Sequence, residues 1–358
     1  MEDLEECNSK CRKVGLCSFC FYRKGEWIRV KTDKNTLATV SFNYTTADPR
    51  STSSDPIYQG LTTVKQNTTI GGLLYGLGDN RRALGVLANV TVEGKTSETG
   101  YYEMGDKLEL VRKEDTKTTD FIRSKFAIPQ QVVSIEEGSV LIVDDLNRRW
   151  RLPLGDETYK ELTNQGVLRV CREVATERDM FSCMGTFYEL PAENADGYAK
   201  IRPISTHNYR INDYASYRGM LVLTGVTPED TKGNPHIIVS DDGKAAVWVG
   251  VIDDLWTLGK PVGHGGPWKN TNVKAGIASD PYLIGFYDKK ELSLSHQSDK
   301  KSSLRLKWIL PVMEMDGICR LYCTTWRKVR SATPGGISSK MDSFCIGYRY
   351  KSNCLVGL

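Results

Sequence analysis

The sequence predicts an all-β protein, and within that class a β-propeller of roughly five to seven blades. Short apolar runs separated by turn residues follow one another along most of the chain. The composition includes 32 Gly and 17 Tyr, and no long helical stretch interrupts the runs. The strongest runs recur about every 35 to 50 residues, which is the length of one four-stranded blade. Two packed β-sandwiches would give similar strand spacing and are the structural alternative.

The predicted strands are short and are bounded by Gly, Asp, Asn or Pro, which is typical of β-structure. In chain order the clearest are residues 71–76, 84–92, 139–143, 219–224, 236–240, 245–251 and 282–287. Ser-Asp-Asp-Gly-Lys at 240–244 predicts a hairpin in which Gly243 supplies a positive φ, and residues 143–152 predict a second. One short helix is expected, starting at Asp156 and stopping at Gly166. Strands that follow strands favour antiparallel sheets over a parallel doubly wound sheet.

Charge and cysteine are concentrated at the two ends of the chain. Residues 304–358 hold nine Lys/Arg against three Asp/Glu, while residues 1–303 hold 39 against 41. The main body is therefore not basic, which argues against nucleic acid as a partner. Eight of the ten cysteines lie in the first 20 or the last 40 residues. This distribution divides the chain into a Cys-rich segment at 1–26, a propeller domain at 27–305, and a basic Cys-rich tail at 306–358 that is interpreted as frame-shifted or disordered.

Sequence signals for a membrane span and for secretion are weak. No apolar run approaches the roughly 18 residues that a span needs. The chain opens on acidic residues and shows no apolar stretch of the signal-peptide kind. As written, the sequence predicts a cytoplasmic protein, and an incomplete N-terminus would make it secreted or periplasmic.

Two stretches resemble a known group of proteins. They run from Gly185-Thr-Phe-Tyr-Glu-Leu-Pro to Tyr217-Arg-Gly, and from Asp253-Asp-Leu-Trp to Ser279-Asp-Pro-Tyr. The sequence is similar to an uncharacterised group of bacterial proteins associated with β-propeller folds and polysaccharide-degrading bacteria, over about residues 40–300 of this chain. The resemblance implies a fold and a habitat, and it transfers no catalytic residue.

The first candidate site is the polar segment 200–218. Arg202, Arg210 and Arg218 are expected to bind substrate, since two guanidinium groups can pair with the carboxylate of a uronate. His207, Tyr217 and Asp213 are the candidate catalytic residues, because their side chains can move a proton. His207 follows an extended run that Pro203 favours. The alternative is a solvated loop whose charges satisfy one another.

The second candidate site is the Gly-rich segment 260–280. Trp268 offers a flat apolar face on which a sugar ring could stack, and His264, Lys269 and Asp280 supply charge. Neither the spacing of a P-loop nor a strand-to-helix context is present, so a phosphate cradle is not predicted. The alternative is a long connecting loop with a buried Trp.

No cofactor is predicted. With four histidines and no HExxH motif, a conventional catalytic zinc site is not expected. Cys7, Cys11, Cys17 and Cys20 have only one typical zinc spacing, so zinc is not favoured there. Calcium held by turn carboxylates is compatible with the sequence, although no EF-hand loop occurs.

The leading hypothesis is therefore a carbohydrate-active protein, a glycoside hydrolase or uronate lyase acting on polysaccharide fragments. The competing hypothesis is a non-catalytic propeller that binds a glycan or a protein partner through the same face. An oligosaccharide or polysaccharide is the expected ligand. Geometry separates the two hypotheses, because catalysis needs acid and base groups that converge on one pocket.

Overall fold

The computed structural model describes residues 27–47, 55–78, 82–125, 128, 131–160, 170–173, 178–192, 196–230, 233–298, 302–309, 326–328 and 337–341. The four N-terminal cysteines, at which zinc was not favoured, and most of the helix expected to start at Asp156 lie outside these residues. The strands are β1 (Trp27–Thr32), β2 (Thr36–Thr45), β3 (Thr68–Leu77), β4 (Ala83–Val92), β5 (Lys95–Met104), β6 (Leu110–Lys113), β7 (Val133–Ile135), β8 (Val140–Val143), β9 (Arg149–Leu152), β10 (Val170–Glu173), β11 (Arg178–Cys183), β12 (Thr186–Leu190), β13 (Arg202–Thr206), β14 (Tyr214–Tyr217), β15 (Met220–Leu223), β16 (Ile237–Val239), β17 (Ala246–Gly250), β18 (Gly263–Val273), β19 (Tyr282–Leu283), β20 (Lys289–His296), β21 (Leu304–Ile309), β22 (Trp326–Lys328) and β23 (Ile337–Met341). The helical elements are α2 (Thr116–Lys125) and the 3₁₀ turns η3 (Pro56–Tyr58), η5 (Gly197–Lys200), η6 (Pro228–Asp230) and η7 (Ile252–Thr257).

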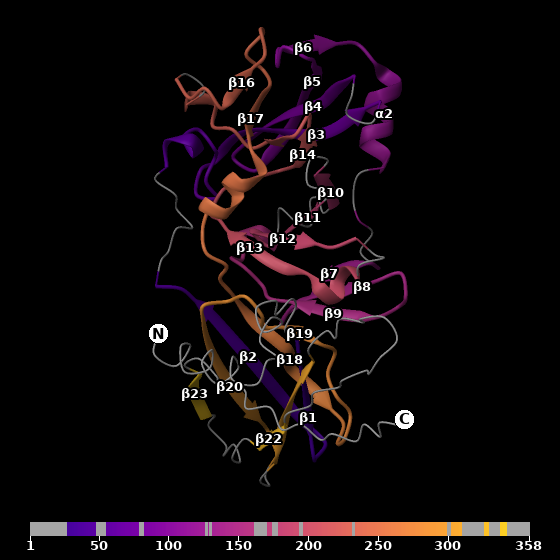
Figure 1. The fold of residues 1–358 in the computed structure, drawn as a ribbon, viewed down its shortest axis with the longest axis vertical. Coiled ribbons are helices and arrows are strands. Elements are labelled where there is room, and N and C mark those ends of the chain that lie inside the picture. The colour runs from indigo at the N-terminus through magenta and orange to yellow at the C-terminus, as the bar shows by residue number, and fades with distance from the viewer. Residues whose placement is uncertain are drawn as a thin grey trace, which may run out of the picture.

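The strands form five separate sheets, so the all-β prediction is confirmed. Two are simple antiparallel meanders, β3-β4-β5-β6 and β10-β11-β12-β13. Two more have four strands each, in the orders β14-β15-β17-β16 and β18-β2-β20-β23, and the fifth has seven, in the order β22-β21-β1-β19-β9-β8-β7. Figure 1 shows the sheets following one another along the long axis, with β3–β6 at one end and β2, β18 and β20 near the other.

The sheets pack face to face through separate apolar cores. The β14–β17 sheet is buried on both faces, because Val247 and Val249 pack against the β3–β6 sheet while Ala246 and Trp248 pack toward the β10–β13 sheet. This assignment follows from the alternation of side chains along a strand. A continuous apolar run such as residues 245–249 is the expected sequence of a strand covered on both sides.

The largest core joins the β10–β13 sheet, the seven-stranded sheet and the β18–β2–β20–β23 sheet. Its centre holds a group of stacked aromatic rings, in which Phe42 and Tyr282 lie 5.4 Å apart and Tyr44 and Tyr287 lie 4.0 Å apart. Stacked and offset aromatic contacts add to the stabilisation from apolar burial.

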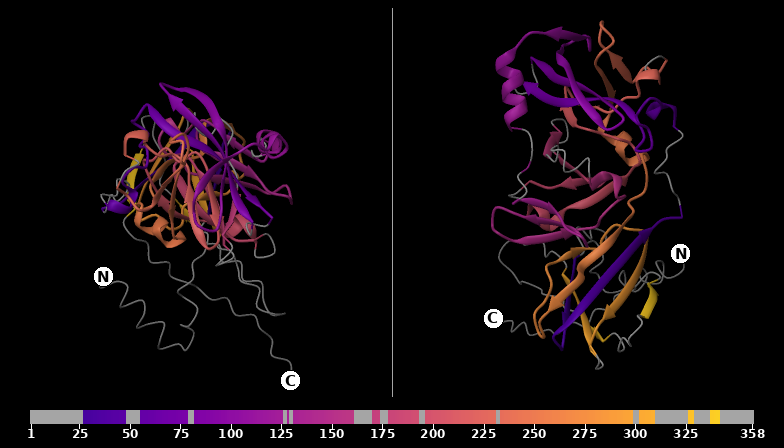
Figure 2. Two further views of the ribbon diagram at one scale, coloured as in Figure 1. Left: turned by 90° about the horizontal axis from the view of Figure 1, so that it is seen from above. Right: turned by 180° about the vertical axis from the view of Figure 1, so that it is seen from behind.

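Segments that are far apart in the sequence pair in this half of the molecule. Strand β1 pairs with β21 over six residues, and β2 lies between β18 and β20. Figure 2 shows the indigo strands of the N-terminal part running beside the orange strands of the C-terminal part. The two ends of the described body are therefore held by ladders of backbone hydrogen bonds.

Helix α2 covers part of the outer face of the β3–β6 sheet. Ile122 of the helix is fully buried against Leu87 and Tyr101. Asp115 precedes the helix and accepts hydrogen bonds from the backbone N–H and the hydroxyl of Thr118 at 3.0 and 2.7 Å. This N-cap holds the pKa of Asp115 below its ordinary value and fixes the start of the helix.

Most predicted strands and both predicted hairpins are present. The hairpin at 240–244 joins β16 to β17 with Gly243 at φ 70°, and β8 pairs with β9 in the second. The expectation at 282–287 is wrong in length, because only Tyr282 and Leu283 form a strand and Phe286 has φ 67°. Strand β21 crosses the predicted start of the tail at residue 306, and β22 and β23 lie within the tail; none of the three was expected. The rest of the tail lies outside the described residues.

Candidate functional site

His207 follows strand β13 and is 4% exposed. Its Nδ1 accepts the backbone N–H of Tyr209 at 3.2 Å, and the Tyr159 hydroxyl lies 3.3 Å from the same atom. Its Nε2 is buried with no hydrogen-bond partner among the described residues. Burial lowers the pKa of His207 to about 4, because the charged ring would lose its hydration. His207 is therefore a neutral ring enclosed in the protein, away from any solvent-borne ligand.

Asp213 and Tyr217 are both fully buried, in places different from that of His207. Asp213 accepts the backbone N–H of Leu74 at 2.6 Å and that of Tyr214 at 2.8 Å, so its carboxylate ties β3 to β14. Tyr217 packs between the β3–β6 and β14–β17 sheets. The structure does not bring the three candidate catalytic side chains together, and each has a structural role where it lies.

The candidate binding residues are also spread over the molecule. Arg210 lies near His207 and donates to the Val64 carbonyl at 3.4 Å. Arg218 forms an ion pair with Asp106 and donates from Nε to the Tyr217 hydroxyl at 3.2 Å. These two arginines therefore contact different parts of the molecule.

The Gly-rich segment is largely strand β18 and not the loop that both interpretations expected, although its tryptophan is buried as the structural alternative predicts. Trp268 is 7% exposed and packs in the largest core, while His264 and Lys269 are exposed. Asp280 forms ion pairs with Arg149 at 3.2 Å and with Arg151 at 2.9 Å. Its carboxylate is therefore neutralised on the seven-stranded sheet.

One candidate residue, Arg202, lies at an accessible aromatic surface. Its Nε donates to Glu189 Oε2 at 2.7 Å, and a second guanidinium nitrogen donates to the same oxygen. Its guanidinium carbon lies 5.2 Å from the centre of the Trp256 ring, which is within the range of cation–π contacts. Trp256 is 40% exposed. We call Trp256, Arg202 and Glu189 the Trp256 surface.

The turn that carries Trp256 is firmly attached to the body. Within η7, Leu255 is 1% exposed, and the Tyr58 hydroxyl is hydrogen-bonded to the Asp254 carbonyl and the Thr257 hydroxyl. The Asp254 carboxylate accepts the N–H of Val251 at 2.8 Å, which closes the start of the turn. The ring is thus presented by a packed element, and little conformational freedom would be lost when a ligand binds.

Sequence reasoning missed Trp256. It stands in the same stretch as Trp268, and aromatic content alone does not tell which of the two is exposed. The usable signal is the pattern Ile252-Asp-Asp-Leu-Trp-Thr, in which the apolar residues at 252 and 255 have the spacing of one helical turn. That spacing buries Leu255 and turns Trp256 outward.

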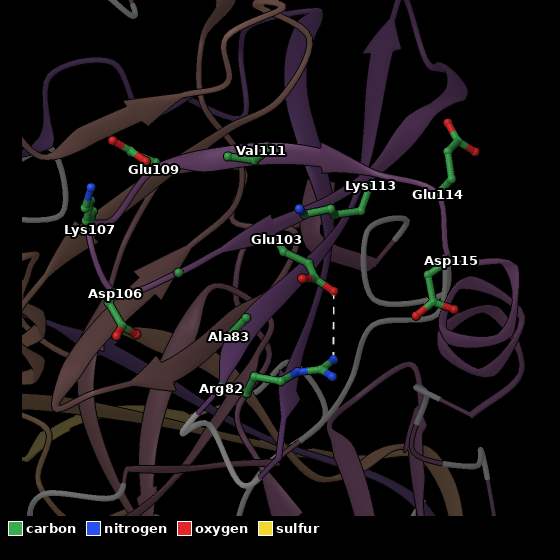
Figure 3. Close-up of a pocket in the computed structure, with 11 residues that line it drawn as sticks. Arg82, Ala83, Glu103, Asp106, Lys107, Glu109, Val111, Lys113, Glu114 and Asp115 are labelled. Carbon is green, nitrogen blue, oxygen red and sulfur yellow. Dashed lines mark ion pairs between the residues drawn. The ribbon is translucent and has the colours of Figure 1, made fainter.

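A pocket of about 670 Å³ lies on the outer face of the β3–β6 sheet beside α2. Figure 3 shows Val111 and Lys113 of β6, Glu109 just before the strand, and the ion pair between Arg82 and Glu103, which lie 4.0 Å apart. The full lining is Arg82, Ala83, Glu103, Gly105, Asp106, Lys107, Glu109, Val111, Lys113, Glu114 and Asp115. Of the predicted site residues, only Arg218 reaches its rim, through Asp106.

Over the part of the chain that the structure describes, no group of three His, Cys, Asp or Glu side chains is arranged to hold a metal ion. Within the same residues, no helix is both long enough and apolar enough to cross a bilayer. Comparison of the chain with models of known protein families gives no match, and comparison with curated proteins gives none either.

Proposed function

We propose that the protein binds glycans through the Trp256 surface and that binding there does not require catalysis. The observation that carries the proposal is the exposed ring of Trp256 beside a guanidinium held in place by Glu189. An exposed aromatic face with adjacent planar polar groups matches a sugar ring, which has an apolar C–H face and hydroxyls around its edge.

Each side chain has a distinct part in this proposal. The Trp256 ring supplies apolar contact to the C–H face of one sugar residue. Arg202 has five N–H donors, and the pair with Glu189 uses two of its nitrogens, so donors remain for sugar hydroxyls or a uronate carboxylate. Glu189 orients Arg202 and its own side chain is only 12% exposed.

The buried positions of His207, Asp213 and Tyr217 favour binding over hydrolysis or lyase chemistry. A general acid or base must come within hydrogen-bond reach of the group it protonates or deprotonates. These three side chains are 4% exposed or less and lie in separate surroundings. The glycoside hydrolase and uronate lyase hypotheses therefore have no acid–base pair among the residues that suggested them.

Glycan-array screening followed by calorimetry tests the proposal. Wild-type protein is expected to bind one or more oligosaccharides, and Trp256→Ala is expected to weaken that binding by about tenfold or more. Phe121→Ala removes a ring of similar exposure, 42%, on helix α2 and should leave the affinity unchanged. Equal affinities for Trp256→Ala and wild type would refute the assignment of the surface.

The same oligosaccharides distinguish binding from catalysis. Reducing ends and the absorbance of unsaturated uronates are expected to stay flat while binding persists. A rise in either signal would restore the hydrolase or lyase hypothesis and would move the search for catalytic residues to other positions.

The propeller is part of the same proposal. The meanders β3–β6 and β10–β13 have the four-stranded antiparallel form of a blade, which supports it. In a propeller each sheet packs on the next in the chain. Here the β3–β6 sheet packs on β14–β17, whereas the chain continues from β6 through α2 into β7. A crystal structure in which the first and last sheets are in contact would establish a closed ring.

A further inference from the structure

We infer that the pocket on the outer face of the β3–β6 sheet is a second ligand site, and that it takes a small carboxylated polyol such as a hexuronate. The inference is independent of the Trp256 surface, which lies on other elements. It rests on the shape of the pocket and on which of its charges are already neutralised.

The backbone of β6 directs alternate side chains into the pocket. Leu110 is 3% exposed and packs inward toward the β14–β17 sheet, so Glu109, Val111 and Lys113 face outward. The ladder places Val111 opposite Glu103 of β5, on the same face. Helix α2 covers the neighbouring part of this face and leaves the pocket open beside it.

The size of the pocket fits a small ligand. Its volume of about 670 Å³ lies within the range of roughly 300–1,000 Å³ that is usual for small-molecule sites. The lining includes Ala83, which has only a methyl group, and Gly105, which has no side chain, so both leave the sheet surface accessible. Val111 is 38% exposed and supplies an apolar contact within an otherwise polar lining.

Most carboxylates of the pocket already have partners. Glu103 accepts the Tyr101 hydroxyl at 3.1 Å and lies 4.0 Å from Arg82. Asp106 is paired with Arg218.

The two carboxylates next to α2 are engaged as well. Glu114 lies 3.9 Å from Arg112. Asp115 is the N-cap of α2 through Thr118. Four of the five carboxylates that line the pocket therefore already take part in an ion pair or a hydrogen bond.

Three charges remain available to a ligand. Lys107, Lys113 and Glu109 line the pocket, and no ion pair within 4.0 Å joins any of them to another charged group among the described residues. Asp115 also keeps its negative charge, because its hydrogen-bond partner Thr118 is neutral, so the two ammonium groups give a local and not a net positive charge. A ligand carboxylate would be attracted to the lysines, while Glu109 would accept hydrogen bonds from hydroxyl groups.

This combination selects among ligand classes. A simple anion would use the lysines but would be repelled by Glu109. A neutral sugar would use Glu109 but would leave both ammonium groups without a partner. A hexuronate uses both, and its C–H face can lie on Val111, so the carboxylated polyol is the class that satisfies the whole set.

Binding of glucuronate, glucose and inorganic phosphate, followed by calorimetry or by NMR, tests the inference. Glucuronate is expected to bind in preference to glucose and to phosphate, and added salt is expected to weaken its binding. Lys113→Gln and Lys107→Gln should each reduce the glucuronate affinity by about threefold to tenfold.

Two control variants show whether glucuronate binds at this pocket and not elsewhere on the protein. Lys95→Gln removes an exposed lysine at the end of strand β5 that is farther from the pocket, and it should leave glucuronate binding unchanged. The second variant, Trp256→Ala, should weaken glucuronate binding only if glucuronate binds at the Trp256 surface. Binding that is lost in Trp256→Ala and unaltered in both lysine variants would therefore overturn the inference. Equal binding of glucose, equal binding of phosphate, or an unaltered affinity in both lysine variants would overturn the inference.

Discussion

The stability of the protein should fall on mild acidification because of His207. Its ring is 4% exposed and its pKa is lowered to about 4 from an ordinary value of 6.5. Between these two values the unfolded chain binds a proton at this position and the folded chain does not, so acid favours unfolding. The stabilisation from a neutral His207 is complete above about pH 6.5 and is lost as the pH falls toward 4. The loss is about 2 kcal/mol at about pH 5, and it approaches about 3 kcal/mol below pH 4.

Urea unfolding at a series of pH values between about 7.5 and 4.5 measures this effect through the free energy of unfolding. His207→Gln cannot take up the proton, so its stability should vary less with pH, whatever the substitution costs at neutral pH. His264→Gln replaces an exposed histidine and should keep the wild-type dependence. If His207→Gln and wild type lose the same free energy between neutral and mildly acidic pH, the enclosed neutral ring is not the cause and the burial argument fails.

Two further substitutions test the packing between sheets. Asp213→Asn keeps one acceptor oxygen but loses the charge and one of two short backbone hydrogen bonds. It should therefore lower the free energy of unfolding, measured by urea titration, by about 2–4 kcal/mol. Asp145→Asn changes an exposed position and should alter this free energy by less than about 0.5 kcal/mol. Gly155→Ala would place a methyl carbon 1.9 Å from the Met184 carbonyl oxygen and should lower the thermal midpoint, since the backbone must shift at a cost of about 1–3 kcal/mol. Gly105→Ala meets nothing within 4 Å and should leave the midpoint unchanged. Equal midpoints for the two glycine variants, or equal stabilities for the two aspartate variants, would contradict the packing described.

Local sequence signals predicted a minority of the strands, mainly those of the central part of the chain, and both hairpins. Residues 245–249 form a continuous apolar run because both faces of β17 are covered, and Gly243 is where the turn requires a positive φ. Pairing between distant segments could not be predicted in the same way. The place of β2 between β18 and β20 depends on which sheet edges meet after folding, and no local pattern encodes it. Helix α2 was missed although Asp115 followed by Thr118 is a usable N-cap signal.

The candidate site was harder to predict because residue type does not reveal burial. His207, Asp213 and Tyr217 have the side chains of catalytic groups, yet their neighbours in space enclose them. Trp268 and Trp256 illustrate the same limit, since both are aromatic residues in one polar stretch and only the second is substantially exposed. Arg202 was predicted from the sequence to bind substrate, and the structure places it beside Trp256.

Selective oxidation of tryptophan tests the glycan-binding surface most directly. Among the tryptophans whose side chains the structure describes, Trp256 is 40% exposed, whereas Trp27, Trp150, Trp248 and Trp268 are 9% exposed or less. N-bromosuccinimide should therefore oxidise Trp256 ahead of these four, as peptide mass spectrometry would show. An oligosaccharide that binds the protein is expected to slow the oxidation of Trp256. Unchanged oxidation of Trp256 in the presence of a saturating, bound oligosaccharide would contradict the assignment of this surface.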